Sequence, residues 1–220
     1  MADEPCLYVL AGTNGAGNSS LLGELLRRSS GVSHYDPDAA TRRLLEANPR
    51  ATLEQANSAA WEQGKRLVLR AIEERLDFAI ETTLGGETYV GIFEKALAAG
   101  IEVRLWYVGL ASPELHLARV AARVAKGGHD IPEAKIRERY DRGRENLLRL
   151  LPMLTEMRLL DNSAEGDPDR GERPRPKLLL HTARGRIVSV CALGSTPAWA
   201  KPIVAAALRW RKTPGRRRRR

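Results

Sequence analysis

A glycine-rich turn between an apolar segment and a leucine-rich segment constrains this chain more than any other feature. The apolar segment, residues 6–12, predicts a buried strand that ends in glycine, and the leucine stripe predicts a helix over residues 18–28. The turn follows the template G-x-x-x-x-G-K-[ST] at every fixed position except the lysine. Its residues, with the serine that follows, are Gly12, Thr13, Asn14, Gly15, Ala16, Gly17, Asn18, Ser19 and Ser20.

A turn of this kind, placed between a strand and a helix, favours phosphate binding. Glycines let backbone N–H groups point inward, and the N-terminus of the helix adds partial positive charge. We therefore predict that residues 12–20 bind the phosphates of ATP, with the Ser19 hydroxyl as a ligand of Mg²⁺. The alternative is a glycine-rich connecting turn that binds nothing.

Asn18 stands at the position where the template has lysine. A neutral amide there replaces an ammonium group that would donate hydrogen bonds to the β- and γ-phosphates. Such charge-assisted bonds contribute about 1.5–3 kcal/mol, against about 1 kcal/mol for neutral ones. If the charge acts mainly in the transition state, its loss should slow phosphate transfer by about 10²–10³-fold. Nucleotide binding could persist, because the backbone cradle remains.

The later sequence alternates strand and helix patterns, which predicts a three-layer α/β fold with a mainly parallel sheet. Apolar runs predict strands over residues 32–35, 77–83, 101–110 and 157–160, and a β-hairpin over 178–182 and 187–192. Periodicity and capping residues predict helices from residue 37 and over 52–75, 86–99, 113–126, 132–150 and 197–210. In the helix over 52–75 the expected buried residues are Leu53, Ala56, Ala60, Leu67, Leu69 and Ile72.

The positive charge of the chain is concentrated at its end. The net charge is +9, and residues 209–220 carry eight positive charges and no negative one, which leaves about +1 for the rest. We expect a main domain over residues 1–163, a C-terminal hairpin and helix over 164–208 that pack on it, and a disordered basic tail over 209–220. The tail could bind nucleic acid, but only weakly and without sequence preference.

Other features bear on where the protein works. No apolar run approaches the length of a transmembrane helix, and the acidic N-terminus does not resemble a signal peptide. Cys6 and Cys191 each lie in a segment that predicts a buried strand, so we expect small buried side chains and no disulfide. These features favour the cytoplasm and give no sign of a membrane partner.

Acidic and hydroxyl side chains follow two of the predicted strands. Asp36 and Asp38 come after the strand over 32–35, at the end of a strand where ligands bind in parallel sheets. Asp38 could accept a proton from a substrate hydroxyl; the alternative is that both residues only start a helix. Glu81, Thr82 and Thr83 end the next strand and could bind substrate, unless they are merely a polar strand end.

Arginines flank a glycine break in the second half of the chain. Two predicted helices are joined by Gly127-Gly128, an arrangement typical of a lid that closes over a transferring phosphate. Guanidinium groups suit phosphate oxygens and keep their charge. Arg123, with Arg137 or Arg139, is the stronger lid candidate. Arg119 alone is more typical of a solvated surface, and His129 more typical of a loop-ordering residue than of a base.

The order of these motifs resembles the zeta toxin family of P-loop kinases, most closely its compact chromosomal branch. The resemblance covers residues 6–163 and is carried by the segments AGTNGAG, HYDPDAA, FAIETTLGG, RVAARVAKGGHDIP, IRERYDRGRENL and LLDNS. It implies a P-loop kinase fold with a helical lid and an ATP-dependent, Mg²⁺-assisted phosphotransferase. Characterised members phosphorylate UDP-N-acetylglucosamine, often under the control of an antitoxin protein.

The resemblance also implies roles for single residues. Asp38 is similar to the general base, Ser19 to the Mg²⁺ ligand, and Glu81 and Thr83 to substrate contacts. Arg123, with Arg137 or Arg139, is similar to the lid that stabilises the phosphate. Family members keep lysine where this chain has Asn18. Two alternatives stay open: a P-loop kinase for another metabolite, and a nucleotide-binding module without turnover.

Overall fold

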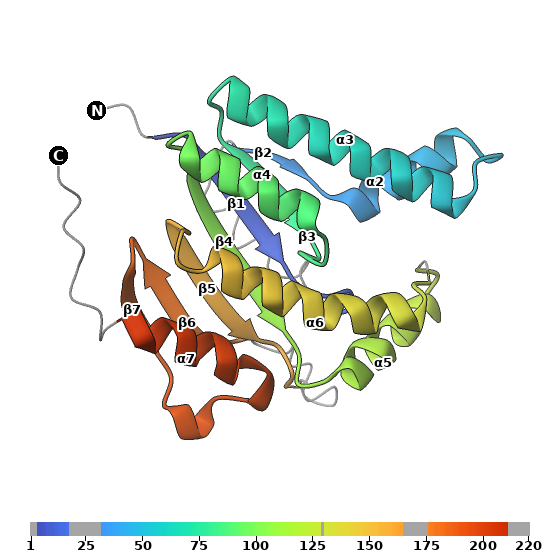
Figure 1. The fold of residues 1–220 in the computed structure, drawn as a ribbon. Coiled ribbons are helices and arrows are strands. Elements are labelled where there is room, and N and C mark those ends of the chain that lie inside the picture. Colours follow the sequence, from blue (N-terminus) through green and yellow to red (C-terminus); the bar gives the residue numbers. More distant parts are fainter. Residues whose placement is uncertain (1–3, 18–31, 129, 165–175, 211–220) are drawn as a thin grey trace.

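The computed structural model describes residues 4–17, 32–128, 130–164 and 176–210, and within these ranges one seven-stranded sheet runs in the order β2-β3-β1-β4-β5-β6-β7 (Figure 1). The strands are β1 (Cys6–Ala11), β2 (Ser33–Tyr35), β3 (Phe78–Thr82), β4 (Glu102–Gly109), β5 (Glu156–Asp161), β6 (Lys177–Ala183) and β7 (Arg186–Val190). The first five strands pair in parallel, and β6 and β7 add an antiparallel hairpin. The mainly parallel α/β sheet and the C-terminal hairpin are therefore confirmed. The helix expected over 18–28 lies outside the described residues.

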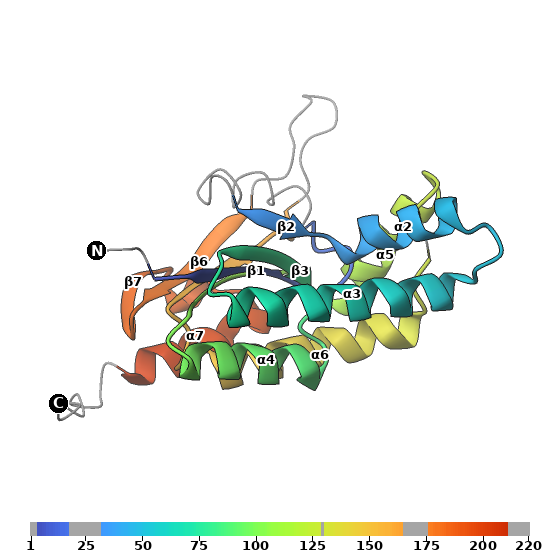
Figure 2. The same ribbon diagram turned by 90° about the horizontal axis from the view of Figure 1, so that it is seen from above.

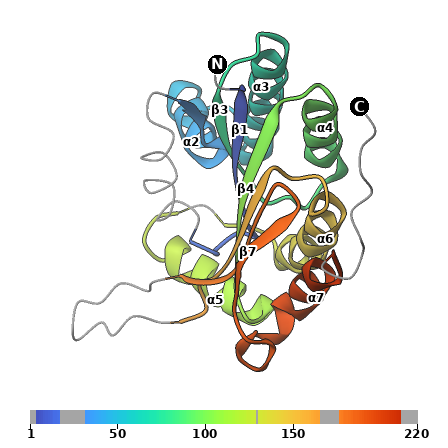
Figure 3. The same cartoon turned by 90° about the vertical axis from the view of Figure 1, so that its left-hand side faces the viewer.

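Helices cover the sheet unevenly. They are α2 (Pro37–Ala47), α3 (Leu53–Glu73), α4 (Glu87–Ala98), α5 (Pro113–Val124), α6 (Glu133–Leu150) and α7 (Lys201–Trp210), with short 3-10 turns at Leu193–Ser195 and Ala198–Ala200. The helices α3, α4, α6 and α7 lie on one face of the sheet (Figure 2), whereas α2 and α5 lie toward the other side (Figure 3). No helix of the described ranges is long and apolar enough to cross a membrane.

Local signals in the sequence set where the helices begin and end. The Asp36 carboxylate accepts hydrogen bonds from the backbone N–H groups of Asp38 and Ala39, which makes it the N-cap of α2. Ser112 caps α5 in the same way, followed by a proline in the first turn. Gly100 has a φ of 75° just after α4, where the sequence predicts the end of that helix.

The central strands β1, β3 and β4 are buried on both faces, as parallel strands between layers of helices usually are, whereas β7 at the edge is largely exposed. The larger core joins alternate residues of β1 and β4 to α3, α4, α6 and α7, and a smaller cluster around Leu10 and Trp106 lies on the opposite face. Trp199, just before α7, lies so close to Gly109 that a Cβ there would meet the indole ring at 2.3 Å. The Trp199 indole N–H also donates to the Asp161 carboxylate at 3.2 Å. The C-terminal segment is thus joined to the strand ends of β4 and β5.

The structure corrects two sequence predictions. Leu53 is 36% exposed, and Leu67, Leu69 and Ile72 are only partly buried. Ala56 and Ala60 are fully buried as predicted, and the rest of the fully buried face of α3 is made of Gly64, Val68 and Ala71. They recur every three or four positions and let the helix lie close to the sheet and to neighbouring rings.

The second correction concerns Cys191, which follows β7 instead of lying within it. The Cys191 side chain is partly buried, and its Sγ lies 3.1 Å from the Thr196 hydroxyl. Both Cys191 and the buried Cys6 are free thiols.

The close packing of α3 can be tested at Gly64. A Cβ at this position would meet the Tyr35 ring at 2.8 Å and the Tyr89 hydroxyl at 3.0 Å, whereas a Cβ at Gly91 of α4 would meet no atom within 4 Å. We expect Gly64→Ala to lower the free energy of unfolding by about 1–3 kcal/mol through overpacking. Gly91→Ala should raise it by about 0.5–1 kcal/mol through helix propensity. Urea denaturation measures both, and equal effects of the two substitutions would contradict this packing.

Candidate functional site

The glycine turn leaves β1 at the carboxyl end of the sheet. The Gly12 N–H donates to the Thr82 carbonyl at 3.1 Å, and the Ala16 N–H donates to the Thr13 carbonyl at 3.0 Å, which closes a tight turn. Gly15 and Gly17 have φ angles of 83° and 91°, in the left-handed region that favours glycine. This is the backbone curvature that a phosphate loop requires. Asn18, Ser19 and Ser20 lie outside the described residues.

Both helices of the expected lid hold the turn at Asn14. The imidazole Nδ1 of His116, on α5, lies 2.9 Å from the Asn14 carbonyl oxygen. The Arg139 guanidinium, on α6, donates to the Asn14 side-chain oxygen at 2.7 Å, and the Thr13 hydroxyl donates to the Arg139 carbonyl at 3.3 Å. A single residue of the turn thus connects β1 to both α5 and α6.

The end of β5 holds the turn from a third direction. The side-chain amide of Asn162 donates to the Ala16 carbonyl at 2.8 Å, and the Asn162 carbonyl accepts from Arg119 of α5 at 2.8 Å. A Cβ at Gly17 would meet this amide nitrogen at 2.5 Å, so glycine is required there for close approach as well as for its φ. The turn is therefore fixed by segments far from it in the sequence.

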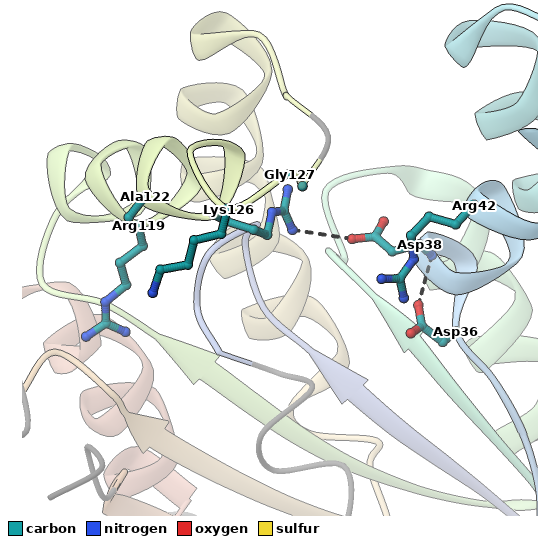
Figure 4. A pocket seen from close by; sticks show the side chains of 9 residues that line it. Asp36, Asp38, Arg42, Arg119, Ala122, Lys126 and Gly127 are labelled. Atoms are coloured by element: carbon teal, nitrogen blue, oxygen red, sulfur yellow. Dashed lines mark hydrogen bonds and ion pairs between the residues drawn. The ribbon is translucent and has the colours of Figure 1, made fainter. Parts of the chain in front are cut away.

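A cleft of about 540 Å³ opens between the first turns of α2 and the outer face of α5 (Figure 4). Two carboxylates lie on the α2 side, and most of its cations lie on the α5 side. The lining residues are Asp36, Asp38, Arg42, Arg119, Ala122, Arg123, Lys126, Gly127 and Gly128. Four cationic side chains against two carboxylates make the cleft suitable for an anion.

Asp38 faces Arg123 across the cleft. The two side chains form an ion pair at 3.5 Å, with the carboxylate 48% and the guanidinium 35% exposed. Ion pairs this exposed contribute little to stability, about 0–1 kcal/mol. A ligand can therefore exchange with either partner at small cost. Asp36 lies at the same opening but uses its carboxylate to cap α2.

The strand β3 holds a buried acid near the carboxylates of Asp36 and Asp38. Glu81 is 9% exposed, and its Oε1 lies 3.7 Å from Nε2 of His34 in the middle of β2. Burial, together with the negative charges of Asp36 and Asp38, raises the pKa of Glu81 to about 8. Burial lowers the pKa of His34, and the charge of Asp36 only partly opposes this. Both side chains are therefore neutral at pH 7, and Glu81 can donate a hydrogen bond there.

The two threonines that follow Glu81 use their hydroxyls locally. The Thr82 hydroxyl accepts from the Leu84 N–H at 3.1 Å, and the Thr83 hydroxyl accepts from the Gly85 N–H at 3.4 Å. These bonds shape the loop into α4 and leave each hydroxyl its own proton to donate.

The structure separates the two arginine candidates of α6. Arg139 is partly buried against Gly85, where a Cβ would meet the Arg139 side chain at 2.7 Å, and burial lowers its pKa. Arg137 points away and forms exposed ion pairs at 2.8 Å with Glu114 and Glu133. The structure thus brings Arg139 to the glycine turn, pairs Arg123 with Asp38 across the cleft, and leaves Arg137 on the outer surface. His129 lies outside the described residues.

Several residues of the site were not predicted from the sequence. Arg42 and Lys126 line the cleft, one on each side, and His116 and Asn162 hold the turn. Arg42 follows Asp38 by four positions on α2, a spacing that places both on one face of a helix and could have identified it. His116 lies 102 residues from Asn14 in the sequence, and Asn162 lies 146 residues from Ala16. Nothing local in the sequence indicates either contact.

The described residues fit the phosphate chain of a nucleotide. A Cβ would obstruct the turn at Gly15 and Gly17, and the cleft beside them is lined with cations. Within the described ranges no group of three or more His, Cys, Asp or Glu side chains could hold a metal by itself. A bound Mg²⁺ would therefore depend on the phosphates and on few protein ligands, as Mg²⁺ sites in kinases usually do.

Comparison with known proteins places the chain among toxins with this fold. A family model described as Zeta toxin matches residues 2–159. A curated Haemophilus influenzae protein of unassigned function is 33% identical over 129 residues, which is 59% of this chain and 88% of that protein.

Two solved structures share the fold at low sequence identity. The complex of AvrRxo1-ORF1 with AvrRxo1-ORF2, solved with sulphate ions, matches 94% of this chain with a TM-score of 0.68 and 16% identity. This chain spans 65% of that protein, which has also been solved with ATP. The PezAT toxin–antitoxin system of Streptococcus pneumoniae matches 93% of this chain and 77% of its own, with a TM-score of 0.61 and 15% identity.

The raised pKa of Glu81 predicts a dependence of stability on pH. Between its ordinary pKa of 4.5 and about 8, Glu81 holds a proton when folded and not when unfolded, so stability falls as the pH rises. Below pH 6.5, the ordinary pKa of His34, its lowered folded pKa acts in the opposite direction. We therefore expect the free energy of unfolding to fall between pH 6.5 and 8, by up to about 1.4 kcal/mol per pH unit.

Glu81→Gln should abolish this loss in urea denaturation series at several pH values. Glu156→Gln is the matched control. Burial raises the pKa of Glu156, but the bond from Arg158 outweighs it, so the pKa is lowered and Glu156 does not titrate in this range. A parent protein whose stability is level from pH 6.5 to 8 would contradict the assignment of a buried neutral acid.

Proposed function

The chain belongs to the Zeta toxin family of P-loop kinases, and we propose that it transfers a phosphate from ATP to a hydroxyl of a small molecule. One observation carries this proposal: Arg139 of α6 is bound to Asn14 of the glycine turn, and Asp38 faces Arg123 of α5 across the neighbouring cleft. The ATP complex of AvrRxo1-ORF1:AvrRxo1-ORF2 supports the choice of nucleotide.

The nucleotide side of the cleft is the turn with α5. The backbone N–H groups of Asn14, Gly15 and Gly17 would bind the β- and γ-phosphates, since that of Ala16 already donates to the Thr13 carbonyl. Arg123 and Arg139 would offset the negative charge that builds up on the transferred group. Ser19 would hold Mg²⁺, which screens the phosphate oxygens. Arg139 is already oriented by Asn14, whereas Arg123 can leave Asp38 for a phosphate.

The acceptor side is α2 with the end of β3. Asp38 is exposed enough to reach a hydroxyl group and would accept its proton as the oxygen attacks. Glu81 would donate a hydrogen bond from its neutral carboxyl, with Asp36, Thr82 and Thr83 completing the contacts. A sugar nucleotide of the UDP-N-acetylglucosamine type offers carbonyl and hydroxyl groups that match such donors. The acceptor is proposed from the family, and another hydroxyl metabolite would use the same base.

We also propose an antitoxin protein as a partner. One structural relative comes from the PezAT toxin–antitoxin system, and the other is solved as a complex of two proteins, AvrRxo1-ORF1 and AvrRxo1-ORF2. An antitoxin is of use only if the kinase is active, so Asn18 makes turnover the first property to measure. If the protein is instead a binding module without turnover, it would still bind the nucleotide in this cleft but would not transfer phosphate.

The proposal predicts that Asn18→Lys raises the rate of ATP consumption. Restoring the ammonium group should speed transfer by about 10²–10³-fold with a suitable acceptor, because it stabilises charge in the transition state. A screen of hydroxyl metabolites, with UDP-N-acetylglucosamine included, and detection of phosphorylated product by mass spectrometry would identify the acceptor.

Two arginine variants of the lysine-restored protein serve as controls. Arg139→Ala should lower the rate by about 10²-fold or more, whereas Arg137→Ala, which removes only exposed ion pairs, should change it less than about threefold. Tight ATP binding without product, even with Lys at position 18, would favour the binding module. Equal losses from both arginine variants would contradict the arrangement of the site.

A further inference from the structure

His116 is a buried titratable residue that the proposed reaction does not use. Its side chain is on α5 and is 1% exposed. Nδ1 lies 2.9 Å from the Asn14 carbonyl oxygen, and the ring meets Tyr140 of α6 edge-on at 5.6 Å between centroids. A carbonyl oxygen can only accept, so Nδ1 must carry the proton and donate.

The same helix carries cationic residues of the cleft. Arg119 and Arg123 follow His116 by three and seven positions, which places the three residues along one side of α5. The backbone of His116 also touches the turn directly, since a Cβ at Gly15 would meet the His116 carbonyl at 2.9 Å. His116 is thus one of the points at which α5 contacts the turn, one helical turn before Arg119 and two before Arg123.

The His116 imidazole is suited to a fixed bond. Burial lowers its pKa to about 4, with Arg119 and Arg144 adding to the effect and the bond to Asn14 only partly opposing it. The ring therefore stays neutral, and its donor does not change between pH 5.5 and 8. A charged ring here would repel the arginines that the cleft needs for a phosphate.

We propose that His116 is a positioning residue for phosphate binding: its bond to the Asn14 carbonyl holds the α5 cations at a fixed distance from the glycine turn. This inference rests on the proposed function, because it assigns His116 a role in binding the nucleotide phosphates. It differs from a core-filling role in a testable way. Packing depends on the ring, whereas positioning depends on the donor at Nδ1.

The test uses the full chain and compares substitutions of His116 that keep either the ring or the hydrogen-bond donor, but not both. His116→Phe keeps the ring and its contact with Tyr140 but loses the donor, and His116→Asn keeps a donor near the place of Nδ1 but loses the ring. Thr196→Val is the matched control, because it removes a buried hydroxyl that donates to the Ala192 carbonyl in the C-terminal segment. The affinity for Mg-ADP is measured by calorimetry, and the melting temperature is measured in parallel.

We expect His116→Phe to weaken Mg-ADP binding about tenfold, and His116→Asn and Thr196→Val to stay within about threefold of the parent. In the lysine-restored protein, His116→Phe should lower kcat more than it raises KM. If His116→Phe does not fold, His116→Gln replaces it, since its amide sits near Nε2 and cannot reach Asn14.

Three results would overturn the inference. The donor has no role if His116→Phe binds Mg-ADP as the parent does, or if His116→Phe and His116→Asn lose affinity equally. The role is only structural if Thr196→Val weakens binding as much as His116→Phe. A parent protein that does not bind Mg-ADP would overturn the proposed function and, with it, this inference.

Discussion

The attachment of the glycine turn to three later segments is the constraint on which the site depends. A loop of small residues has little packing of its own, so its shape must be imposed by neighbours. Here Asn14 is bound by α5 and α6, and Ala16 is bound by the end of β5. These contacts also fix where α5 and α6 stand, and so where their arginines point. Loop, lid helices and sheet thus form one connected unit.

The charges of the cleft differ in how firmly they are held. Arg139 is partly buried and bound to Asn14, which keeps its guanidinium in place before any ligand arrives. Arg123 is more exposed and pairs with Asp38 through a weak ion pair that a phosphate can replace. A phosphate that takes the place of Asp38 beside Arg123 would leave the Asp38 carboxylate available to the acceptor hydroxyl. In the proposed reaction, binding of the phosphate and release of the Asp38 carboxylate would be coupled through this one pair of residues.

Much of the fold could be predicted because its signals are local. The strand before the glycine turn, the caps at Asp36 and Ser112, and the helix end at Gly100 each depend on a few adjacent residues. On the buried face of α3, Ala56 and Ala60 were predicted correctly, but the larger residues also expected inside are only partly buried or exposed, because small residues pack against the rings there. That choice depends on how close the sheet comes, which no pattern within one helix records.

In the candidate site, too, features that depend on adjacent residues could be predicted and those that depend on distant contacts could not. Glycines, acids and arginines could be selected by type and order, and of these Asp36, Asp38 and Arg123 line the cleft while Arg139 contacts the glycine turn. Arg137 and Arg139 could not be told apart, because residues two positions apart point to different sides of a helix and either side could have faced the turn. His116 and Asn162 were missed because their roles come only from contacts with a loop over 100 residues away.

Whether this site holds the phosphate chain of a nucleotide can be seen in a crystal structure with Mg²⁺ and a non-hydrolysable ATP analogue. We expect the terminal phosphates against the backbone of residues 12–17, within hydrogen-bonding distance of Arg123 and Arg139. Phosphates bound elsewhere, or a glycine turn closed against its own neighbours while the analogue occupies another site, would contradict this expectation.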